Sequence, residues 1–336
     1  IDSTYAFAEY GIGSVQADQG QLAEATERLN RAAHIEPELT PALHALARIF
    51  IGQGHYDRAE EMLNRAIQQN GDEAHTHRMI GRLFTSVERF RGAETALNRA
   101  IELAPRDAHA LFLLASLYLK TERKTEAIER LRQALRIDPF HLEATHSLAS
   151  MLQGTEGATA SESERLMLRY ERLSGLANTE AKHRYQLRDD PDNAQARLGL
   201  AQTYMAMRKT AEAITQLRAL LLTDPDHRNA GLQLCQLLAQ SNDLESAIDL
   251  ANSLAQRLPS DPDVHLTLGN VHRMANRLDE AEQAFTRVVE LNPGLAAGWQ
   301  NLGNLCLAKR EPECAVGYFQ KAIEILPERT ESHFNL

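Results

Sequence analysis

The sequence predicts an all-α fold: an α-α superhelix, or solenoid, of stacked antiparallel helix pairs. Three observations predict it: a 34-residue internal period, small residues at two fixed places in that period, and a shortage of turn-forming and aromatic residues. The residues that close each segment fall 34 residues apart in both halves of the chain. They are Pro37, Gly71, Pro105 and Pro139, and then Pro191, Pro225, Pro259, Pro293 and Pro327.

Two positions of the period carry only small residues. With the closing residue numbered 32, position 20 is alanine in all eight regular units: Ala25, Ala59, Ala93, Ala127, Ala213, Ala247, Ala281 and Ala315. Position 8 is glycine, alanine or cysteine from Gly13 to Gly303. Small residues there let two helix backbones approach closely, while larger apolar residues at positions 7, 24 and 27 reach the next unit. Because one pair cannot bury its own apolar face, neighbouring pairs must stack.

The composition favours helices and argues against several classes of protein. Only 5% of the 336 residues are aromatic, and 18 glycines with 11 prolines are too few for the many tight turns of a β-sandwich. The net charge of −10 argues against nucleic acid or an anionic membrane as the main partner. No apolar run approaches the ~20 residues of a membrane span, so we expect a soluble chain without direct membrane insertion. The compartment stays open between cytoplasm and export, because a signal peptide removed before Ile1 would leave no trace.

Each unit is expected to contain a first helix, a turn, a second helix and a closing proline that ends the second helix. Residues that tolerate turn conformations stand near positions 15 to 17: Gly20, Gly54, Asn242 and Asn276. The expected organisation is repeats one to four in residues 1–141, an irregular fifth repeat in 142–193, repeats six to nine in 194–329, and the start of a truncated tenth repeat in 330–336.

The fifth repeat carries an insertion of about 18 residues, since 52 residues separate Pro139 from Pro191. After a normal first helix over 142–153, a stretch of Gly, Thr and Ala at 154–160 predicts a loop. The insertion, at 154–190, either bends or spaces the stack, or forms a lid or docking element beside the concave side.

Two helices are expected inside the insertion. Residues 161–164, Ser-Glu-Ser-Glu, have the form of a capping box, with Ser161 as N-cap and Glu164 reaching back. They predict a helix with an apolar side of Leu166, Tyr170 and Leu173. A further short helix is expected over 179–187.

The last complete unit carries the motif of a known family. Its matching residues are Trp299, Leu302, Gly303, Ala315, Phe319, Ala322 and Pro327, with Cys306 in place of the usual tyrosine. On these residues and the period, the chain resembles the tetratricopeptide repeat (TPR) family. The resemblance implies a helical-repeat protein that binds proteins or peptides, with no catalysis by the repeat itself.

The end of the chain also follows the period. Residues 330–336 match positions 1 to 7 of a tenth unit and stop inside its first helix. Because arrays usually finish with a polar capping helix, we expect the chain to be part of a longer protein with further domains beyond either end.

A basic and partly aromatic surface is expected on the concave side of repeats two to four. Positions 2, 5, 9, 12 and 13 of the first helices complement the stripe that packs inward. There they supply His44, Arg48, His75, Arg78, Arg82, His109, Phe112 and Lys120. This is either a solvated face neutralised by nearby acids, or a site for an acidic peptide or carboxylate that arginine binds bidentately. The lysine and asparagine of the family's chaperone-tail clamp are absent, since Tyr10 with Ser14 and His44 with Arg48 stand there.

Repeats six to nine have a different concave surface. Position 9 supplies a carboxamide row of Gln202, Gln236, Asn270 and Asn304, with Leu198, Leu232 and Leu266 beside it at position 5. A carboxamide both donates and accepts, so such a row can pair with the backbone of an extended peptide. The alternative is a solvated or inter-repeat polar row.

No metal, cofactor or catalytic site is expected. His75 and His77 point to different sides of a helix, and no HExxH or glycine-rich phosphate loop occurs. The three cysteines, Cys235, Cys306 and Cys314, are odd in number and are expected to be separate buried thiols, with neither a disulfide framework nor a zinc site.

The sequence therefore predicts a non-catalytic scaffold that binds a protein or extended peptide within a multi-protein assembly. A substrate-recruiting arm of a larger enzyme, such as a glycosyltransferase, is a second reading. The asparagine ladder of those transferases at position 6 is missing, since Ala45, Met79 and Leu113 stand there in repeats two to four. A structural role in homo-oligomers or filaments is a third.

Overall fold

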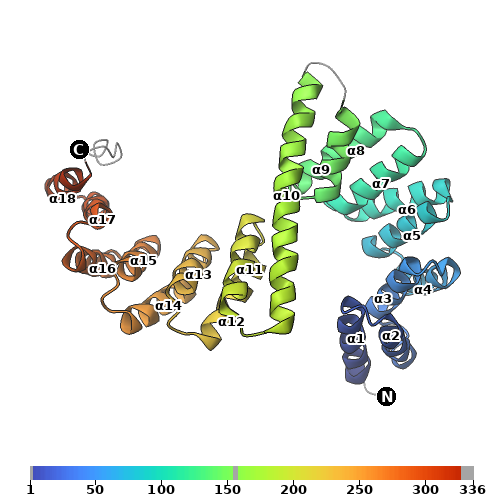
Figure 1. Ribbon diagram of the computed structural model, residues 1–336, viewed down its shortest axis with the longest axis horizontal. Helices are drawn as coiled ribbons and strands as arrows, with labels where there is room; N and C mark the ends of the chain where they lie inside the picture. The colour runs from blue at the N-terminus through green and yellow to red at the C-terminus, as the bar shows by residue number, and fades with distance from the viewer. Residues whose placement is uncertain (1–2, 154–157, 327–336) are drawn as a thin grey trace. The chain divides into compact units, whose positions relative to one another are not determined.

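The computed structural model describes residues 3–153 and 158–326, in which every regular element is an α-helix. The all-α prediction is therefore confirmed. Consecutive helices pack as pairs, α1 with α2, α3 with α4 and so on (Figure 1). Within these residues, no helix is long and apolar enough to cross a membrane. The expected start of a tenth repeat at 330–336 lies outside the described residues.

The chain divides into two compact units, which we call unit 1, Ile1–Ser174, and unit 2, Gly175–Leu336. Unit 1 contains α1 (Ser3–Asp18), α2 (Leu22–Ile35), α3 (Thr40–Gly52), α4 (Tyr56–Gln69), α5 (Ala74–Ser86), α6 (Phe90–Leu103), α7 (Ala108–Lys120), α8 (Lys124–Ile137) and α9 (Leu142–Leu152). The division falls inside α10 (Ala158–Asp189). Unit 2 continues with α11 (Ala194–Ala206), α12 (Thr210–Thr223), α13 (Arg228–Gln240), α14 (Leu244–Arg257), α15 (Pro262–Met274), α16 (Leu278–Leu291), α17 (Ala296–Ala308) and α18 (Pro312–Ile325).

The small residues lie where two helices of a pair meet. All eight alanines at position 20 are at most 1% exposed. At position 8, a methyl group on Gly81 would stand 2.4 Å from Cγ of Leu97, and one on Gly303 would stand 2.6 Å from the ring of Phe319. Within each of these pairs, a large side chain of the second helix therefore fills the space beside the small residue of the first helix.

A left-handed residue makes the turn inside every regular pair. Positive φ angles occur at position 15 of all eight, from Gly20 (81°) and Gly54 (77°) to Arg310 (65°). Sequence patterns indicated four of these turns, where glycine or asparagine stands. The other four are made by Glu88, Glu122, Arg208 and Arg310, which rarely adopt this conformation.

The insertion differs from the prediction. A single 32-residue helix, α10, replaces the two expected helices. It includes 158–160, which were expected in a loop, while 154–157 lie outside the described residues. Ser161 and Glu164 lie inside α10, so the capping box is wrong. One glycine costs a helix only about 1 kcal/mol, so Gly175 does not end it.

The apolar side expected for the insertion is present. Leu166 and Leu173 are buried, and the Tyr170 ring lies 4.6 Å from the ring of His146. Ser163 donates a hydrogen bond to the carbonyl of Ala149 at the end of α9. These contacts pack the first half of α10 against α9 within unit 1.

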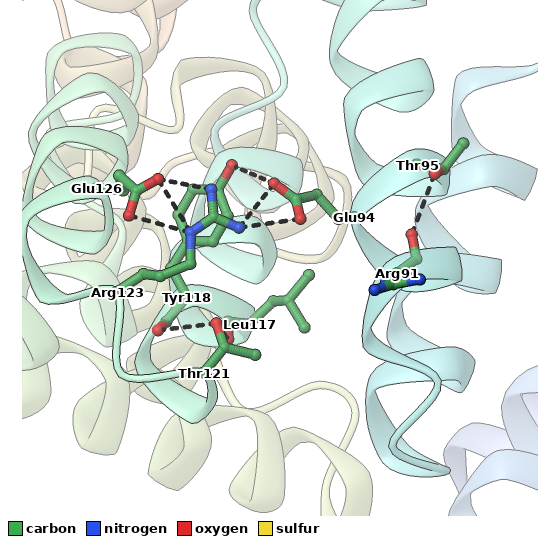
Figure 2. Close-up of polar contacts among 8 residues, drawn as sticks. All are labelled: Arg91, Glu94, Thr95, Leu117, Tyr118, Thr121, Arg123 and Glu126. Atoms are coloured by element: carbon green, nitrogen blue, oxygen red, sulfur yellow. Dashed lines mark hydrogen bonds and ion pairs between the residues drawn. The ribbon is translucent and has the colours of Figure 1, made fainter.

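Three positions lie around the turn of each pair, and in the fourth pair they form a polar cluster (Figure 2). The guanidinium of Arg123 donates to Glu126 at 2.9 Å and to Glu94 of the preceding pair at 2.9 Å. It lies 4.0 Å above the ring of Tyr118, whose hydroxyl donates to Glu94. We call positions 11, 16 and 19, here Tyr118, Arg123 and Glu126, the turn triad.

Ion pairs between successive helix pairs recur along the chain. Arg89 at position 16 pairs with Glu60 of the preceding unit at 2.8 Å, and Arg277 pairs with Glu245 at 2.6 Å. Each links a turn to the second helix before it. Individually, such exposed pairs contribute at most about 1 kcal/mol.

The cysteines are not all separate thiols as predicted. Cys306 of α17 and Cys314 of α18 form a disulfide, whereas Cys235 is free and buried. Eight residues separate the pair in sequence, and the turn of the helix hairpin brings them together. The sequence did not predict this disulfide, because the two cysteines do not have the spacing of a CxxC motif.

Candidate functional site

A cavity of about 370 Å³ opens on the first helices of unit 1, and we call it the groove cavity. Six of the eight residues predicted for the basic surface line it: His44, Arg48, His75, Arg78, Arg82 and His109. The other lining residues are Tyr10, Ser14, Pro41, Ala45, Ile51, Met79 and Leu113. The two remaining predicted residues, Phe112 and Lys120, do not line it.

The repeat explains why these side chains meet. The helices α1, α3, α5 and α7 pack in sequence, so residues at equivalent positions stand side by side. Positions 2, 5 and 9 supply the polar wall. Position 6 supplies an apolar floor of Ala45, Met79 and Leu113, which the sequence analysis did not assign to the site. Its 34-residue recurrence was the signal that would have found it.

His44 belongs to a buried hydrogen-bond chain. Thr76, which is fully buried, donates its hydroxyl hydrogen to Glu73 at 2.9 Å. Its oxygen must then accept from Nε2 of His44, 2.7 Å away, so this nitrogen carries the proton. Burial, with smaller contributions from His75 and Arg78, lowers the pKa of His44 to about 4 against the opposing effect of Glu73.

The other two cavity histidines behave similarly. Desolvation and the neighbouring charge of Arg78 lower the pKa values of His75 and His109. At pH 7 the three rings are therefore neutral. The positive charge among the residues that line the cavity thus comes from its arginines.

Arg78 is held in the wall of the cavity. It pairs with Asp107 at 2.5 Å, and its second amino group donates to Nδ1 of His75 at 2.6 Å. Asp107 also accepts from the backbone N–H groups of His109 and Ala110 and so caps α7. Asp107, two residues after the closing Pro105, therefore offsets the charge of Arg78.

Arg48 and Arg82 are exposed at the cavity. The nearest carboxylate oxygen to Arg48 is that of Asp18, 3.5 Å away across an exposed surface. Arg82 has no ion pair among the described residues. The unpaired positive charge among the described cavity residues is therefore that of Arg82, while Arg48 is held by an exposed ion pair.

The two predicted residues outside the cavity have other surroundings. Phe112 packs 5.9 Å from His109 and 5.0 Å from His141, between ring centroids. His109 and His141 themselves stack at 5.5 Å. Lys120 is exposed in the last turn of α7.

The carboxamide row lies on α11, α13, α15 and α17 of unit 2. Gln202 and Gln236 are exposed, whereas Asn270 and Asn304 are half-buried. Leu198, Leu232 and Leu266 are also half-buried. A cavity of about 590 Å³ in unit 2 is lined by other residues, among them His265, His272 and Arg277.

Two family models match the chain. One, described as the C-terminal ARM domain of tetratricopeptide repeat protein 21, matches residues 8–148. The other, described as tetratricopeptide repeat, matches 177–238, 209–271 and 238–304. Together they account for most of both units.

The curated relatives are much longer than this chain. Human protein O-mannosyl-transferase TMTC1 is 27% identical over 142 residues, which cover 41% of this chain and 16% of the relative. The mouse protein of the same name is 25% identical over 142 residues, covering 41% of this chain and 15% of the relative. The chain thus matches about a sixth of their length.

Solved structures of helical-repeat proteins are also similar. A crystal structure of MamA has a TM-score of 0.43 at 24% identity, covering 48% of this chain and 96% of that one. YrrB, described as a TPR protein with an unusual peptide-binding site, has a TM-score of 0.37 at 18% identity, covering 72% of this chain and 98% of that one.

Proposed function

Because this chain is a tetratricopeptide repeat protein, we propose that it is a non-catalytic scaffold that binds a partner protein through an extended peptide segment. The groove cavity is the observation that carries the proposal. It combines a concave surface, an apolar floor and a few converging polar groups, which is the usual make-up of a binding site. Catalysis would need a nucleophile with a base or an equivalent pair, and the hydroxyl that contacts His44, that of Thr76, is fully buried and donates its hydrogen to Glu73 rather than to the ring.

The chemistry of the cavity supports one kind of ligand. An apolar side chain fits against Met79, Ala45 and Leu113, and an acidic side chain one or two residues away reaches Arg82 or Arg48. The polar groups of His44 and Arg78 are already bonded within the protein, so they shape the wall. We therefore propose a peptide with alternating apolar and acidic residues.

We also propose a second contact surface at the carboxamide row. Its exposed amides, Gln202 and Gln236, suit the backbone of an extended peptide whatever its sequence. The surface in unit 1 would then select the side chains of the peptide, and the surface in unit 2 would bind the peptide backbone.

Selection of peptides from a random display library against the full chain tests the proposal. Selected peptides should be enriched in apolar and acidic residues and should lose at least tenfold in affinity with Arg82→Ala. Arg91→Ala is the matched control, because it removes the same exposed charge from the second helix α6. Equal affinities for both variants would show that the groove cavity is not the binding site.

The match to TMTC1 favours one further candidate function. Its name assigns O-mannosyl transfer to that protein, so we propose as an alternative that this chain is the substrate-recruiting arm of a larger transferase. The coding sequence before and after the segment that encodes this chain distinguishes the recruiting arm from the free-standing scaffold. A glycosyltransferase domain there supports the recruiting arm, and its absence supports the free-standing scaffold.

A structural role in homo-oligomers is the remaining alternative. Light scattering of the full chain over a range of concentrations tests it. A constant monomer mass would exclude this role.

A further inference from the structure

The turn triad changes its chemistry in the last helix pair. In the fourth pair its members are Tyr118, Arg123 and Glu126, which bond to one another through the guanidinium (Figure 2). In the pair of α11 and α12, Lys209 likewise lies over the ring of Tyr204. Positions 11 and 16 are therefore in contact in both pairs.

In the pair of α17 and α18 these positions are Cys306, Glu311 and Cys314. The aromatic ring and one acid are replaced by thiols, and the cation is replaced by a carboxylate. The cationic role passes to Lys309, which pairs with Asp279 and Glu282 of the preceding unit. All three triad residues thus become groups that bind metal ions.

Geometry brings these groups together. One ligand atom from each of the three lies within 4.8 Å of the others, and no other such group occurs among the described residues. A tetrahedral zinc ion with bonds of about 2.3 Å to sulfur holds two thiolates roughly 3.8 Å apart. The Cα atoms of Cys306 and Cys314 lie 5.9 Å apart in the disulfide form, and in the reduced form rotation of the two side chains would separate the sulfurs to bind an ion.

The local environment favours the anionic forms that bind metals. Cys314 and Glu311 stand in the first turn and at the N-cap of α18, where the helix dipole stabilises negative charge. The Glu311 side chain makes no capping hydrogen bond, so its carboxylate is available. Cys306 is 4% exposed, and Cys314 and Glu311 lie progressively nearer to solvent, which leaves an entry path.

We propose that Cys306, Glu311 and Cys314, in the dithiol form of the protein, are a binding site for one zinc ion or a similar thiophilic divalent cation. The structure has the two sulfurs joined as a disulfide, so the metal site and the disulfide are alternative states. A dithiol reductant supplies two electrons and two protons, becomes a disulfide itself and leaves two protein thiols. The metal then displaces one proton from each thiol, and water completes the coordination.

Cobalt and zinc titrations of the reduced, metal-free full chain test the proposal. Cobalt should produce a thiolate charge-transfer absorption that saturates at one ion per chain, and zinc should displace it. Zinc should also raise the Tm of the reduced protein, because an ion that binds only the folded state stabilises it. Absence of the charge-transfer band in the reduced protein would overturn the proposal.

Variants identify the ligands. Cys314→Ser should abolish the band, and Glu311→Gln should weaken zinc binding at least tenfold. The matched controls are Cys235→Ser, which removes the buried free thiol, and Glu313→Gln, which removes a neighbouring exposed acid of α18. Glu311 is exposed, and Cys314→Ser keeps nearly the same volume at a half-buried position, so both variants should retain the wild-type circular dichroism. A band that survives Cys314→Ser, or that is lost with Cys235→Ser, would show that another site binds the ion.

Discussion

At the scale of single residues, neighbours about 30 positions away in the sequence decide the charge of each group at the groove cavity. Arg78 is neutralised by Asp107, whereas Arg82 one turn later is not. His75 and His109 at the same cavity are neutral because burial removes their rings from water and lowers their pKa values. Counting cationic residue types in the sequence therefore overestimates the positive charge of this surface.

The buried His44 should make the stability of unit 1 depend on pH. Its pKa is about 4 in the folded protein and near 6.5 when unfolded, so the neutral ring favours folding above pH 6.5. This contribution, on the order of 3 kcal/mol, should be lost as the pH falls from 6.5 toward 4. Urea unfolding of wild type and His44→Asn at pH 7 and pH 5 measures it. The wild type should lose more stability than the variant between the two values, and parallel losses would contradict the assignment.

Glu9 provides a second prediction at this scale. It is 1% exposed and pairs with Arg28 at 3.0 Å. Burial acts to raise the pKa of Glu9, but hydrogen bonds from Arg28 and Tyr5 outweigh burial and hold it below its usual value. Arg28→Ala leaves this carboxylate buried without its main partner and should cost about 3 kcal/mol in the free energy of unfolding.

Arg31→Ala is the control for this change. Arg31 lies 4.0 Å from Glu9 and pairs mainly with the exposed Glu27, so its loss should cost less than about 1 kcal/mol. Denaturant titration of the two variants side by side measures the difference. Similar costs would mean that Arg28 is not the main partner of Glu9.

At the scale of elements, the left-handed turn sets the geometry of each helix pair. Glycine adopts this conformation without cost, so Gly54 is suited to its turn, with a φ of 77°. A methyl group there would meet no atom within 4 Å, so only the backbone opposes a larger residue. The same holds for the open space around Gly52, which lies two residues earlier at the end of α3 with a helical backbone.

These two glycines should respond to alanine with opposite signs. Gly54→Ala forces alanine into the left-handed region and should destabilise the protein by about 1 kcal/mol. Gly52→Ala should leave stability unchanged or raise it by up to about 1 kcal/mol, because alanine is the better helix former. Thermal unfolding of both variants checks the pair. A destabilising Gly52→Ala would show that the end of α3 is constrained by something other than its backbone.

At the scale of the whole molecule, periodicity predicts more of the fold than of the site. The helix pairs followed from Ala127 and its seven equivalents, because close packing of two helices requires a small residue whatever surrounds the pair. The single helix of the insertion was not predicted, because residues 161–164 alone have the sequence of a helix cap, whereas in the structure they lie inside a helix over 158–189. Tertiary context overrides a local signal of about 1 kcal/mol.

The site was predictable only in part. Helical periodicity identified the face that holds His44 and Arg82, because position in the repeat determines which side chains converge. It could not identify the partners of Arg78 or Cys306. The pairing of Arg78 with Asp107 depends on side-chain geometry between successive first helices, and that of Cys306 with Cys314 on geometry across a turn. The residue types along the period do not show this geometry.

The two proposed binding surfaces should differ in their dependence on salt. Affinity through Arg82 should fall as ionic strength rises from low to physiological, because exposed charges are screened over about 8 to 10 Å. Neutral hydrogen bonds from Gln236 and Asn270 should be nearly insensitive to salt. Titrating a display-selected peptide at two salt concentrations against Arg82→Ala and against Gln236→Ala with Asn270→Ala separates them. The same salt slope for both variants would contradict the division.

The ion pairs between successive helix pairs make the array modular in length. Glu60 and Glu94 occupy the same place in neighbouring repeats, as do Arg89 and Arg123. Removal of residues 74–107, one whole period, would bring Glu60 opposite Arg123 and restore the lost pair with the same kinds of residue. Recombination between repeats within a gene can therefore lengthen or shorten such an array by whole periods. A new junction between repeats that carry these residues would again contain an arginine–glutamate ion pair.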